Sequence, residues 1–313
     1  MKITFFGSSS FSIPVLKALL SSEHSVAQVV STPDKKQGRG QKLGFSVVKT
    51  FALEQNLPIL TPEKLSLPSV AESIKKREPD FMIVASYGKL IPSTIFKISR
   101  IAPLNVHPSL LPKYRGASPI QQAILEGDQN TGVSIAGITS ELDAGDVFAQ
   151  AETRIGENEN AHELEKRLSE IGAKLVLDVI KQFETGEILR KAQDSLKATY
   201  AKKIVRDSGR IDWTKSAANI HNQVRAFYPW PSAFTFFHGK RLKILETRKT
   251  NETTNMKRTG TIIKIDKDKG LYVETGTGPL ALVHVQLEGR KEMSAFDFAI
   301  GQRVQKGEQF ESL

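Results

Sequence analysis

Residues 80–86, DFMIVAS, and residues 102–107, APLNVH, decide the fold of this 313-residue chain. Each is a short and almost continuous apolar run, and segments with helical spacing lie on either side of them. Strands that are apolar throughout are buried on both faces, as in a parallel sheet covered by helices. The two runs therefore predict an α/β domain built on a mostly parallel, Rossmann-like sheet.

The same alternation extends outward through the first 190 residues. Residues 2–7 and 25–32 are further strand-like runs, whereas residues 12–22 and 160–186 have the apolar spacing of helices. The turn after the first strand reads FFGSSSFS, which lacks the second glycine of the fingerprint G-x-G-x-x-G. The sequence therefore argues against a dinucleotide site in this domain.

The pattern changes near residue 190. Residues 191–207 are polar and basic and predict a linker, and residues 216–227 predict one more helix. Short β-type runs separated by Gly and Asn follow, as in a small β-barrel of OB-like type or a sandwich. We therefore expect domains over residues 1–190 and 208–313, joined by residues 191–207.

Charge is unevenly spread along the chain. Residues 1–190 carry 22 Lys and Arg against 21 Asp and Glu, but residues 191–313 carry 22 against 13. A basic excess confined to one part of a protein points to a polyanionic partner, most commonly nucleic acid. A solvated basic surface that only keeps the protein in solution is the alternative.

Several classes of protein are disfavoured by composition. No apolar run reaches about 18 residues, so no membrane span is expected. Cysteine is absent, which excludes disulfides and thiolate metal sites and fits a reducing compartment such as the cytoplasm. The six His residues are dispersed without ligand spacing, so no metal site is predicted.

Two polar side chains interrupt the end of the second decisive strand. Asn105 and His107 are two positions apart and share one face of an extended strand. Asp143, in SELDAGD, follows another apolar run, so we expect all three at the carboxyl ends of strands, where ligands bind in such sheets. An amide, an imidazole and a carboxylate together suit acyl transfer. Ordinary capping and turn roles are the alternative.

Two longer motifs contain these residues. Residues 104–124 read LNVHPSLLPKYRGASPIQQAI, and residues 131–146 read TGVSIAGITSELDAGD. Together, in this order and at this spacing, they resemble the folate-dependent formyltransferases. This chain departs from that family at Pro108, where Gly is common, and at Gly7-Ser8-Ser9, where G-T-P is frequent.

The resemblance covers essentially the full length and is strongest to family members that act on the methionine of initiator tRNA. It implies an enzyme of translation initiation with 10-formyltetrahydrofolate as co-substrate, no metal and the α-amine of methionyl initiator tRNA as acceptor. It also implies that Asn105, His107 and Asp143 are catalytic. The amine would attack the formyl carbon directly, Asn105 and a protonated His107 would stabilise the oxyanion, and Asp143 would help to remove the proton.

Further binding residues are implied by the same resemblance. The folate is expected to contact Tyr87, Gly88, Leu90, Ile91, Ser109, Leu110, Leu111, Pro112 and Asp146. The tRNA is expected to contact Lys35, Lys36, Arg39 and Lys42, in a basic loop that contains GRGQK, and also Lys113 and Arg115. A salt bridge inside the protein is the alternative for Lys113 and Arg115, and ordinary core packing is the alternative for Leu90 and Ile91.

Two other functions stay open on the sequence. A formyltransferase acting on a small amine, such as a nucleotide or an amino sugar, would share the first domain. An RNA-binding protein with an inactive core would share the overall pattern. The basic second domain and the Arg39 loop favour tRNA, and we expect a monomer that has no membrane partner.

Overall fold

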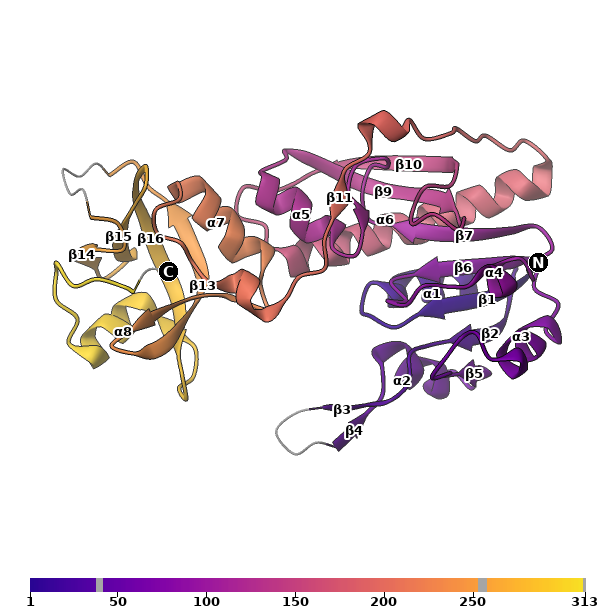
Figure 1. Ribbon diagram of the computed structural model, residues 1–313, viewed down its shortest axis with the longest axis horizontal. Helices are drawn as coiled ribbons and strands as arrows, with labels where there is room; N and C mark the ends of the chain where they lie inside the picture. Colours follow the sequence, from indigo (N-terminus) through magenta and orange to yellow (C-terminus); the bar gives the residue numbers. More distant parts are fainter. Residues whose placement is uncertain (38–41, 253–257, 312–313) are drawn as a thin grey trace. The chain divides into compact units, whose positions relative to one another are not determined.

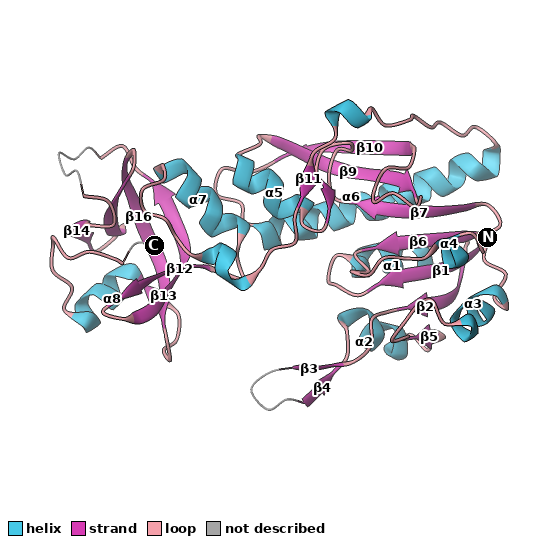
Figure 2. Ribbon diagram, in the orientation of Figure 1, coloured by secondary structure: helices cyan, strands magenta, loops and turns pink. Residues whose placement is uncertain are grey.

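The computed structural model describes residues 1–37, 42–252 and 258–311. The chain forms two compact units, and neither is continuous in sequence. The first unit comprises residues 1–119, 130–154 and 165–202, and the second comprises residues 120–129, 155–164 and 203–313. Most of the predicted linker, residues 191–202, is thus part of the first unit. Figures 1 and 2 show the elements of each unit.

A seven-stranded sheet forms the centre of the first unit, as the apolar runs predict. Its strand order is β10-β9-β7-β6-β1-β2-β5, and the five strands at one side, β7 to β5, are mutually parallel. The strand bounds are β1 (Lys2–Gly7), β2 (Ser25–Val30), β5 (Ile59–Leu60), β6 (Phe81–Ala85), β7 (Ala102–His107), β9 (Asn130–Gly137) and β10 (Val147–Arg154). β1 and β6 are buried almost throughout, which explains their continuous apolar sequence.

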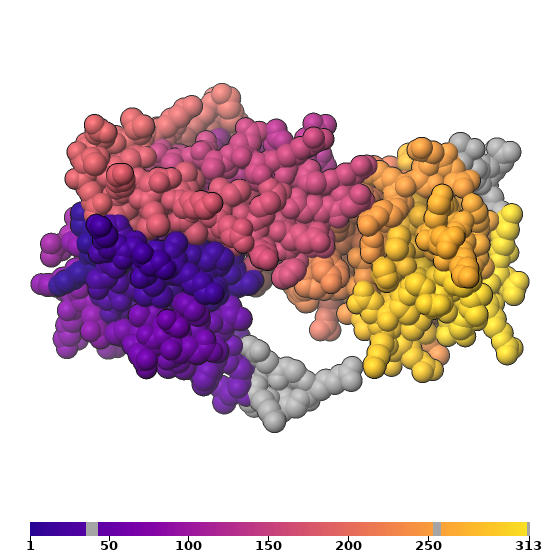
Figure 3. All heavy atoms as spheres, turned by 180° about the vertical axis from the view of Figure 1, so that it is seen from behind, coloured from indigo at the N-terminus to yellow at the C-terminus, as the bar shows by residue number. Residues whose placement is uncertain are grey.

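Helices connect and cover these strands. Their bounds are α1 (Ser12–Leu20), α2 (Val47–Glu54), α3 (Pro68–Lys75), α4 (Ser93–Phe96) and α6 (Ala161–Thr185), of which residues 165–185 belong to the first unit. The helix α5 (Pro119–Glu126) belongs to the second unit from residue 120 onward. In the first unit α6 packs closely on the sheet, since a Cβ at Gly172 would lie 2.7 Å from the side chain of Val106. Near the start of α1, Ser10 donates a hydrogen bond to Glu165 of α6 at 2.7 Å. Figure 3, the view from behind, shows atoms coloured as α6 and the residues after it next to the indigo atoms of the N-terminal residues.

Short elements complete the first unit. The hairpin of β3 (Lys35–Gln37) and β4 (Lys42–Gly44) follows the second strand. β8 (Arg115–Gly116) pairs in parallel with β11 (Tyr200–Ala201), which follows the short helix η1 (Ser195–Lys197). Residues of the predicted linker are therefore held against the segment that follows the Asn105–His107 strand.

The second unit is built on an antiparallel sheet that surrounds an apolar core. Its order is β12-β13-β16-β15-β14, with β17 beside β16. The bounds are η2 (Arg206–Gly209), α7 (Ala217–Ala226), β12 (Ala233–Phe237), β13 (Lys240–Lys249), β14 (Ile262–Asp266), β15 (Gly270–Thr275), β16 (Gly278–Leu287), β17 (Met293–Ser294) and α8 (Ala295–Gln302). The core includes Trp213, Phe237, Phe298 and Phe310.

Residues 309–311 bring the two edges of this sheet together. Glu311 forms a bridge with Phe236 of β12, and Gln309 forms one with Thr261, just before β14. One short segment therefore pairs with both outer strands, so the sheet closes as predicted for a small barrel. Among the described residues, no helix is long and apolar enough to cross a membrane.

Candidate active site

The predicted catalytic residues Asn105 and His107 lie at the end of β7. His107 is the last residue of the strand, and the parallel neighbour β6 ends at Ala85. His107 is buried, with 4% of its side chain exposed, and its Nε2 lies 3.0 Å from the carbonyl oxygen of Tyr114. Because a carbonyl only accepts hydrogen bonds, this nitrogen carries a proton. Nδ1 is left to face the third residue of the site.

The turn that carries Asp143 follows a strand that is antiparallel to β7. β9 runs antiparallel to β7, with Leu104 opposite Gly137, and the amide of Ile138 donates to the carbonyl of Pro103 at 3.0 Å. The carboxyl end of β9 is therefore beside the first half of β7, and the prediction that this turn leaves from the carboxyl edge of a parallel sheet is wrong. Asp143 reaches Asn105 only because the following residues turn back toward it.

Asp143 makes a hydrogen bond with each carboxylate oxygen. Oδ1 accepts from Nδ2 of Asn105 at 3.0 Å, and Oδ2 accepts from the backbone N–H of Gly116 at 2.9 Å. Oδ2 also lies 3.7 Å from Nδ1 of His107. The amide, imidazole and carboxylate singled out in the sequence are thus brought together in the first unit, although 36 positions separate His107 from Asp143 in the sequence.

Gln193 is a member of this arrangement that the sequence did not reveal. Its Nε2 donates to the carbonyl oxygens of Asp143 at 2.8 Å and Gly145 at 2.7 Å. Its Oε1 accepts from Nε of Arg115 at 3.1 Å. A single Gln in a polar segment about 50 residues from the turn carries no local pattern, so only the folded chain identifies it.

Arg115 differs from its predicted role as a phosphate contact. Only 1% of its side chain is exposed, and its Nη1 pairs with Oε1 of Glu141 at 3.0 Å. The salt bridge considered as the alternative is the one that forms, because the guanidinium contacts Glu141 at the start of the turn that carries Asp143. Lys113, in contrast, is exposed, and its Nζ lies 5.9 Å from the ring centroid of Tyr114.

The predicted folate residues separate into buried and exposed groups. In the segment after β6, Gly88 and Leu90 are exposed, and Leu90 has 74% of its surface accessible. Ile91 packs in the apolar core cluster beside Tyr87. Burial raises the pKa of Tyr87 to about 12, and its hydroxyl has no hydrogen-bond partner among the described residues. Core packing is thus the observed role of Ile91.

The other predicted folate residues flank the Asn105–His107 strand and the Asp143 turn. Ser109 is buried and donates to the carbonyl of Lys113 at 2.6 Å. The amide of Leu111 donates to Ser134 on β9 at 3.0 Å. Leu110 and Pro112 are half-buried, and Asp146 has a 4.0 Å ion pair with Arg190. The structure thus places these residues near Asn105, His107 and Asp143, where several of them hold the local backbone by hydrogen bonds.

The predicted tRNA loop is only partly within the described residues. Arg39 lies outside them. Lys35 is exposed on β3, Lys36 lies on the same strand, and Lys42 lies on β4. Among the described residues, no group of three His, Cys, Asp or Glu side chains could hold a metal ion.

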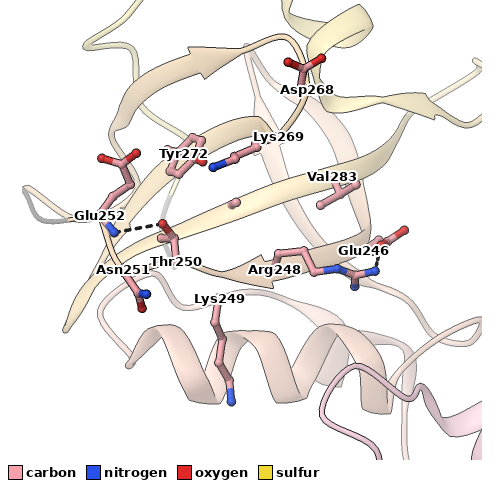
Figure 4. Close-up of a pocket in the computed structure, with 11 residues that line it drawn as sticks. Glu246, Arg248, Lys249, Thr250, Asn251, Glu252, Asp268, Lys269, Tyr272 and Val283 are labelled. Carbon is pink, nitrogen blue, oxygen red and sulfur yellow. Dashed lines mark hydrogen bonds and ion pairs between the residues drawn. The ribbon is translucent and has the colours of Figure 1, made fainter.

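The second unit contains a hollow of about 810 Å³, shown in Figure 4. None of the predicted site residues lines it. Its charged lining consists of three basic and three acidic side chains, so their charges cancel: Arg248, Lys249, Lys269, Glu246, Glu252 and Asp268. Arg248 is also paired with Glu246. The hollow itself therefore offers no concentrated positive charge to a polyanion.

Comparison with known proteins identifies both parts of the chain. Residues 1–180 match the model of the formyl transferase family, and residues 203–303 match that of the formyl transferase C-terminal domain. The chain is 44% identical over 312 residues to methionyl-tRNA formyltransferase of Sulfurihydrogenibium sp. (strain YO3AOP1), covering 99% of this chain and 100% of that protein.

Solved structures share the fold at lower sequence identity. HypX from Aquifex aeolicus, in complex with tetrahydrofolic acid, has a TM-score of 0.67 and 19% identity over 96% of this chain and 47% of that one. WlaRD, a sugar 3N-formyl transferase in the presence of dTDP and 5-N-formyl-THF, has a TM-score of 0.67 and 20% identity over 93% and 99%. The matches to both family models and the full-length identity place this chain in the formyl transferase family.

Proposed function

We propose that this protein transfers the formyl group of 10-formyltetrahydrofolate to the α-amine of methionyl initiator tRNA, for the initiation of translation. The observation that carries the proposal is the convergence of Asn105, His107 and Asp143 in a chain that is 44% identical, over its full length, to a methionyl-tRNA formyltransferase. A folate co-substrate is supported by the family and by related structures with tetrahydrofolate or a formyl derivative.

Each catalytic side chain has a role that follows from its contacts. One N–H of the Asn105 amide is used by Asp143. An amide nitrogen carries two hydrogens, so the second can donate to the oxygen of the formyl group as negative charge develops on it. In His107, Nε2 faces a carbonyl and Nδ1 faces a carboxylate. An imidazolium donates to the carbonyl, turns its second N–H toward the carboxylate and places positive charge next to the reacting group.

Asp143 is the proton acceptor in this proposal. The neutral amine attacks the formyl carbon, and the new N–C bond forms as the carbonyl π electrons move to oxygen. The amine then loses a proton, directly or through water, toward the Asp143 carboxylate. Collapse of the tetrahedral intermediate breaks the bond to the folate N10, which takes up a proton as it leaves. Formylated tRNA and tetrahydrofolate result, and atoms and charge balance.

The tRNA is expected to contact both units. In the first, Lys35 and Lys36 lie on β3 and Lys42 lies on β4. Arg39 belongs to the same basic stretch of the sequence and lies outside the described residues. In the second, the excess of basic residues provides a general attraction for phosphates. Because the charges around the hollow in Figure 4 cancel, that attraction is expected from other basic side chains of the second unit.

Transfer to a small amine is the second candidate, because WlaRD acts on a sugar and shares the fold. One assay separates the two candidates. Purified full-length protein is given 10-formyltetrahydrofolate with methionyl initiator tRNA, with small amines such as an amino sugar nucleotide, or with water alone. Formylation of the tRNA alone supports the proposal. Transfer only to a small amine, or only hydrolysis of the donor, would refute it.

A further inference from the structure

We propose that Gln193 is a positioning residue for the reaction, and that Arg115 orients it. Gln193 holds the turn of residues 141–146 so that the Asp143 carboxylate stays against Asn105 and His107. This inference rests on the proposed function and assigns a catalytic contribution to a segment that the sequence presents as a linker. Neither residue needs to touch a substrate for this role.

The turn needs to be held because Asp143 adopts an unfavourable backbone conformation. Its φ is +51°, in the left-handed region that non-glycine residues seldom adopt. This backbone conformation costs on the order of 1 kcal/mol in a non-glycine residue, and it is retained where contacts with the surrounding structure hold it. Contacts from outside the turn therefore help to keep the carboxylate of Asp143 in place.

Gln193 provides that restraint by joining two carbonyl groups of the turn. The two N–H groups of its amide donate to Asp143 O at 2.8 Å and to Gly145 O at 2.7 Å. Gly145 has no freedom to move toward β9, since a Cβ at this position would lie 2.0 Å from the carbonyl oxygen of Gly137. The turn is thus packed against β9 on one side and hydrogen-bonded to Gln193 on the other.

Arg115 fixes which end of the Gln193 amide faces the turn. Its Nε–H donates to Oε1 of Gln193 at 3.1 Å, so the amide oxygen points to Arg115 and the NH2 group points to the carbonyls. Its Nη1 reaches Glu141, at the start of the same turn, at 3.0 Å. One buried guanidinium therefore connects the beginning of the turn to the side chain that holds its middle.

The energetic cost of burying Arg115 indicates that this residue orients Gln193 and does not serve only to stabilise the fold. The side chain is almost fully buried, and its Nη2 has no hydrogen-bond partner among the described residues. Its ion-pair partner Glu141 is 67% exposed, so the pair recovers little of the cost of removing a charge from water. An apolar residue would fill this position at a lower cost, but it could not orient Gln193.

The backbone on either side of Gln193 is itself fixed. Lys191 and Val147, the first residue of β10, exchange two backbone hydrogen bonds of 2.8 Å. On the other side, the carbonyl of Thr199 accepts from the backbone N–H of Arg115 at 2.8 Å. Gln193 is thus anchored to the strand that follows the turn and to the segment that contains Arg115, so its side chain is a rigid support.

The experiment compares Gln193→Ala with the matched control Gln182→Ala in the full-length protein. Gln182 also supports this segment, since its Oε1 accepts from the N–H of Leu189 at 3.2 Å, but it does not contact the turn. We expect Gln193→Ala to lower kcat for formylation of methionyl-tRNA about tenfold to a hundredfold, as expected when a catalytic group is displaced by about 1 Å. KM for both substrates and the folded fraction should stay near wild type, and Gln182→Ala should match wild type in every respect.

A second variant and a double mutant separate positioning from general stability. Gln193→Glu keeps an acceptor for Arg115 but removes both donors to the turn, so it should fold and still lose kcat. Since Gln193 acts through Asp143, adding Gln193→Ala to Asp143→Ala should lower kcat by less than about twofold. Multiplicative losses in the double mutant, or a Gln193→Glu variant as active as wild type, would overturn the positioning role. Wild-type protein unable to formylate methionyl-tRNA would overturn the proposed function and this inference together.

Discussion

The side-chain amide of Asn105 donates a 3.0 Å hydrogen bond to the carboxylate of Asp143, 38 residues further along the chain. This bond joins the last part of β7 to the turn after β9. It also orients the Asn105 amide, since the nitrogen must face the carboxylate and the carbonyl oxygen must face away. The second N–H of that amide therefore points in a defined direction before any substrate binds, which is the preorganisation that oxyanion stabilisation requires.

Replacing either residue proposed to stabilise the oxyanion should affect turnover far more than binding. We expect Asn105→Ala and His107→Ala each to lower kcat by about a hundredfold or more, because the first removes the proposed donor to the oxyanion and the second removes the positive charge proposed beside it. Single-turnover formylation and equilibrium binding of a folate analogue measure the two effects separately. Asn130→Ala, at an exposed position, is the control and should behave as wild type. Near-normal turnover in either site variant would remove that residue from the mechanism.

The glycine-flanked arginine of the basic loop should matter for the tRNA and not for the folate. We expect Arg39→Ala to raise KM for methionyl-tRNA several-fold, because a phosphate contact would be lost, and to leave folate binding unchanged. Arg39→Lys should recover part of the loss, since it restores the charge but not the planar guanidinium. An Arg39→Ala protein with wild-type KM and kcat for the tRNA would contradict this prediction.

Binding of the tRNA should depend steeply on salt. Residues 191–313 carry nine more basic than acidic side chains, and each phosphate they neutralise releases counterions. We expect the affinity of the full-length protein for initiator tRNA to fall at least about tenfold between about 50 and 200 mM salt. Binding of a folate analogue, measured in the same buffers, should change little. A tRNA affinity that is independent of salt would show that this excess charge has another purpose.

A buried histidine of the second unit should make stability depend on pH. Burial lowers the pKa of His221 from 6.5 to about 4. Its Nε2 donates to the carbonyl of Glu157, and its Nδ1 accepts from the hydroxyl of Thr247. Nearby Arg225, Lys249 and Arg248 also disfavour a charged ring. The unfolded chain therefore binds a proton at higher pH than the folded protein does.

The free energy of unfolding should consequently fall as the pH drops from about 6.5 toward about 4. His221→Gln removes the titrating group. The free energy of unfolding of wild type should therefore fall by about 1.5 kcal/mol relative to that of the variant between about pH 6.5 and pH 5. Urea denaturation of the two proteins at several pH values measures it. A difference that is constant across this range would show that the imidazole does not titrate as proposed.

The sequence predicted the sheet and the first half of the site for a simple reason. Burial on both faces demands apolar strands, and a polar residue at the end of such a strand stands out, as Asn105 and His107 do. The direction of β9 was not predictable in the same way, because an apolar run has the same appearance in a parallel and an antiparallel strand. The path of the Asp143 turn depends on that direction.

Gln193 could not be predicted for a different reason. Its role depends on pairing between Lys191 and Val147 and between β8 and β11, and those pairs join segments that are far apart in the sequence. Similarly, nothing local distinguishes Arg115, a buried cation, from Lys113, an exposed one two positions earlier. The hydrophobic pattern of a sequence indicates which side chains become buried. It does not indicate which side chains form hydrogen bonds between distant segments, because those bonds depend on the tertiary structure.

The second unit contains residues 120–129 and 155–164, which come from the middle of the chain. Its segments therefore depend on one another in any truncated or recombined protein. His221 and Arg225 of α7 both form hydrogen bonds with carbonyl groups in the 155–164 segment. A fragment beginning after residue 203 would leave these two buried side chains without their acceptors. Any related parent supplies these backbone carbonyls, so exchange of the 155–164 segment between relatives should be tolerated, whereas its removal should destabilise the second unit.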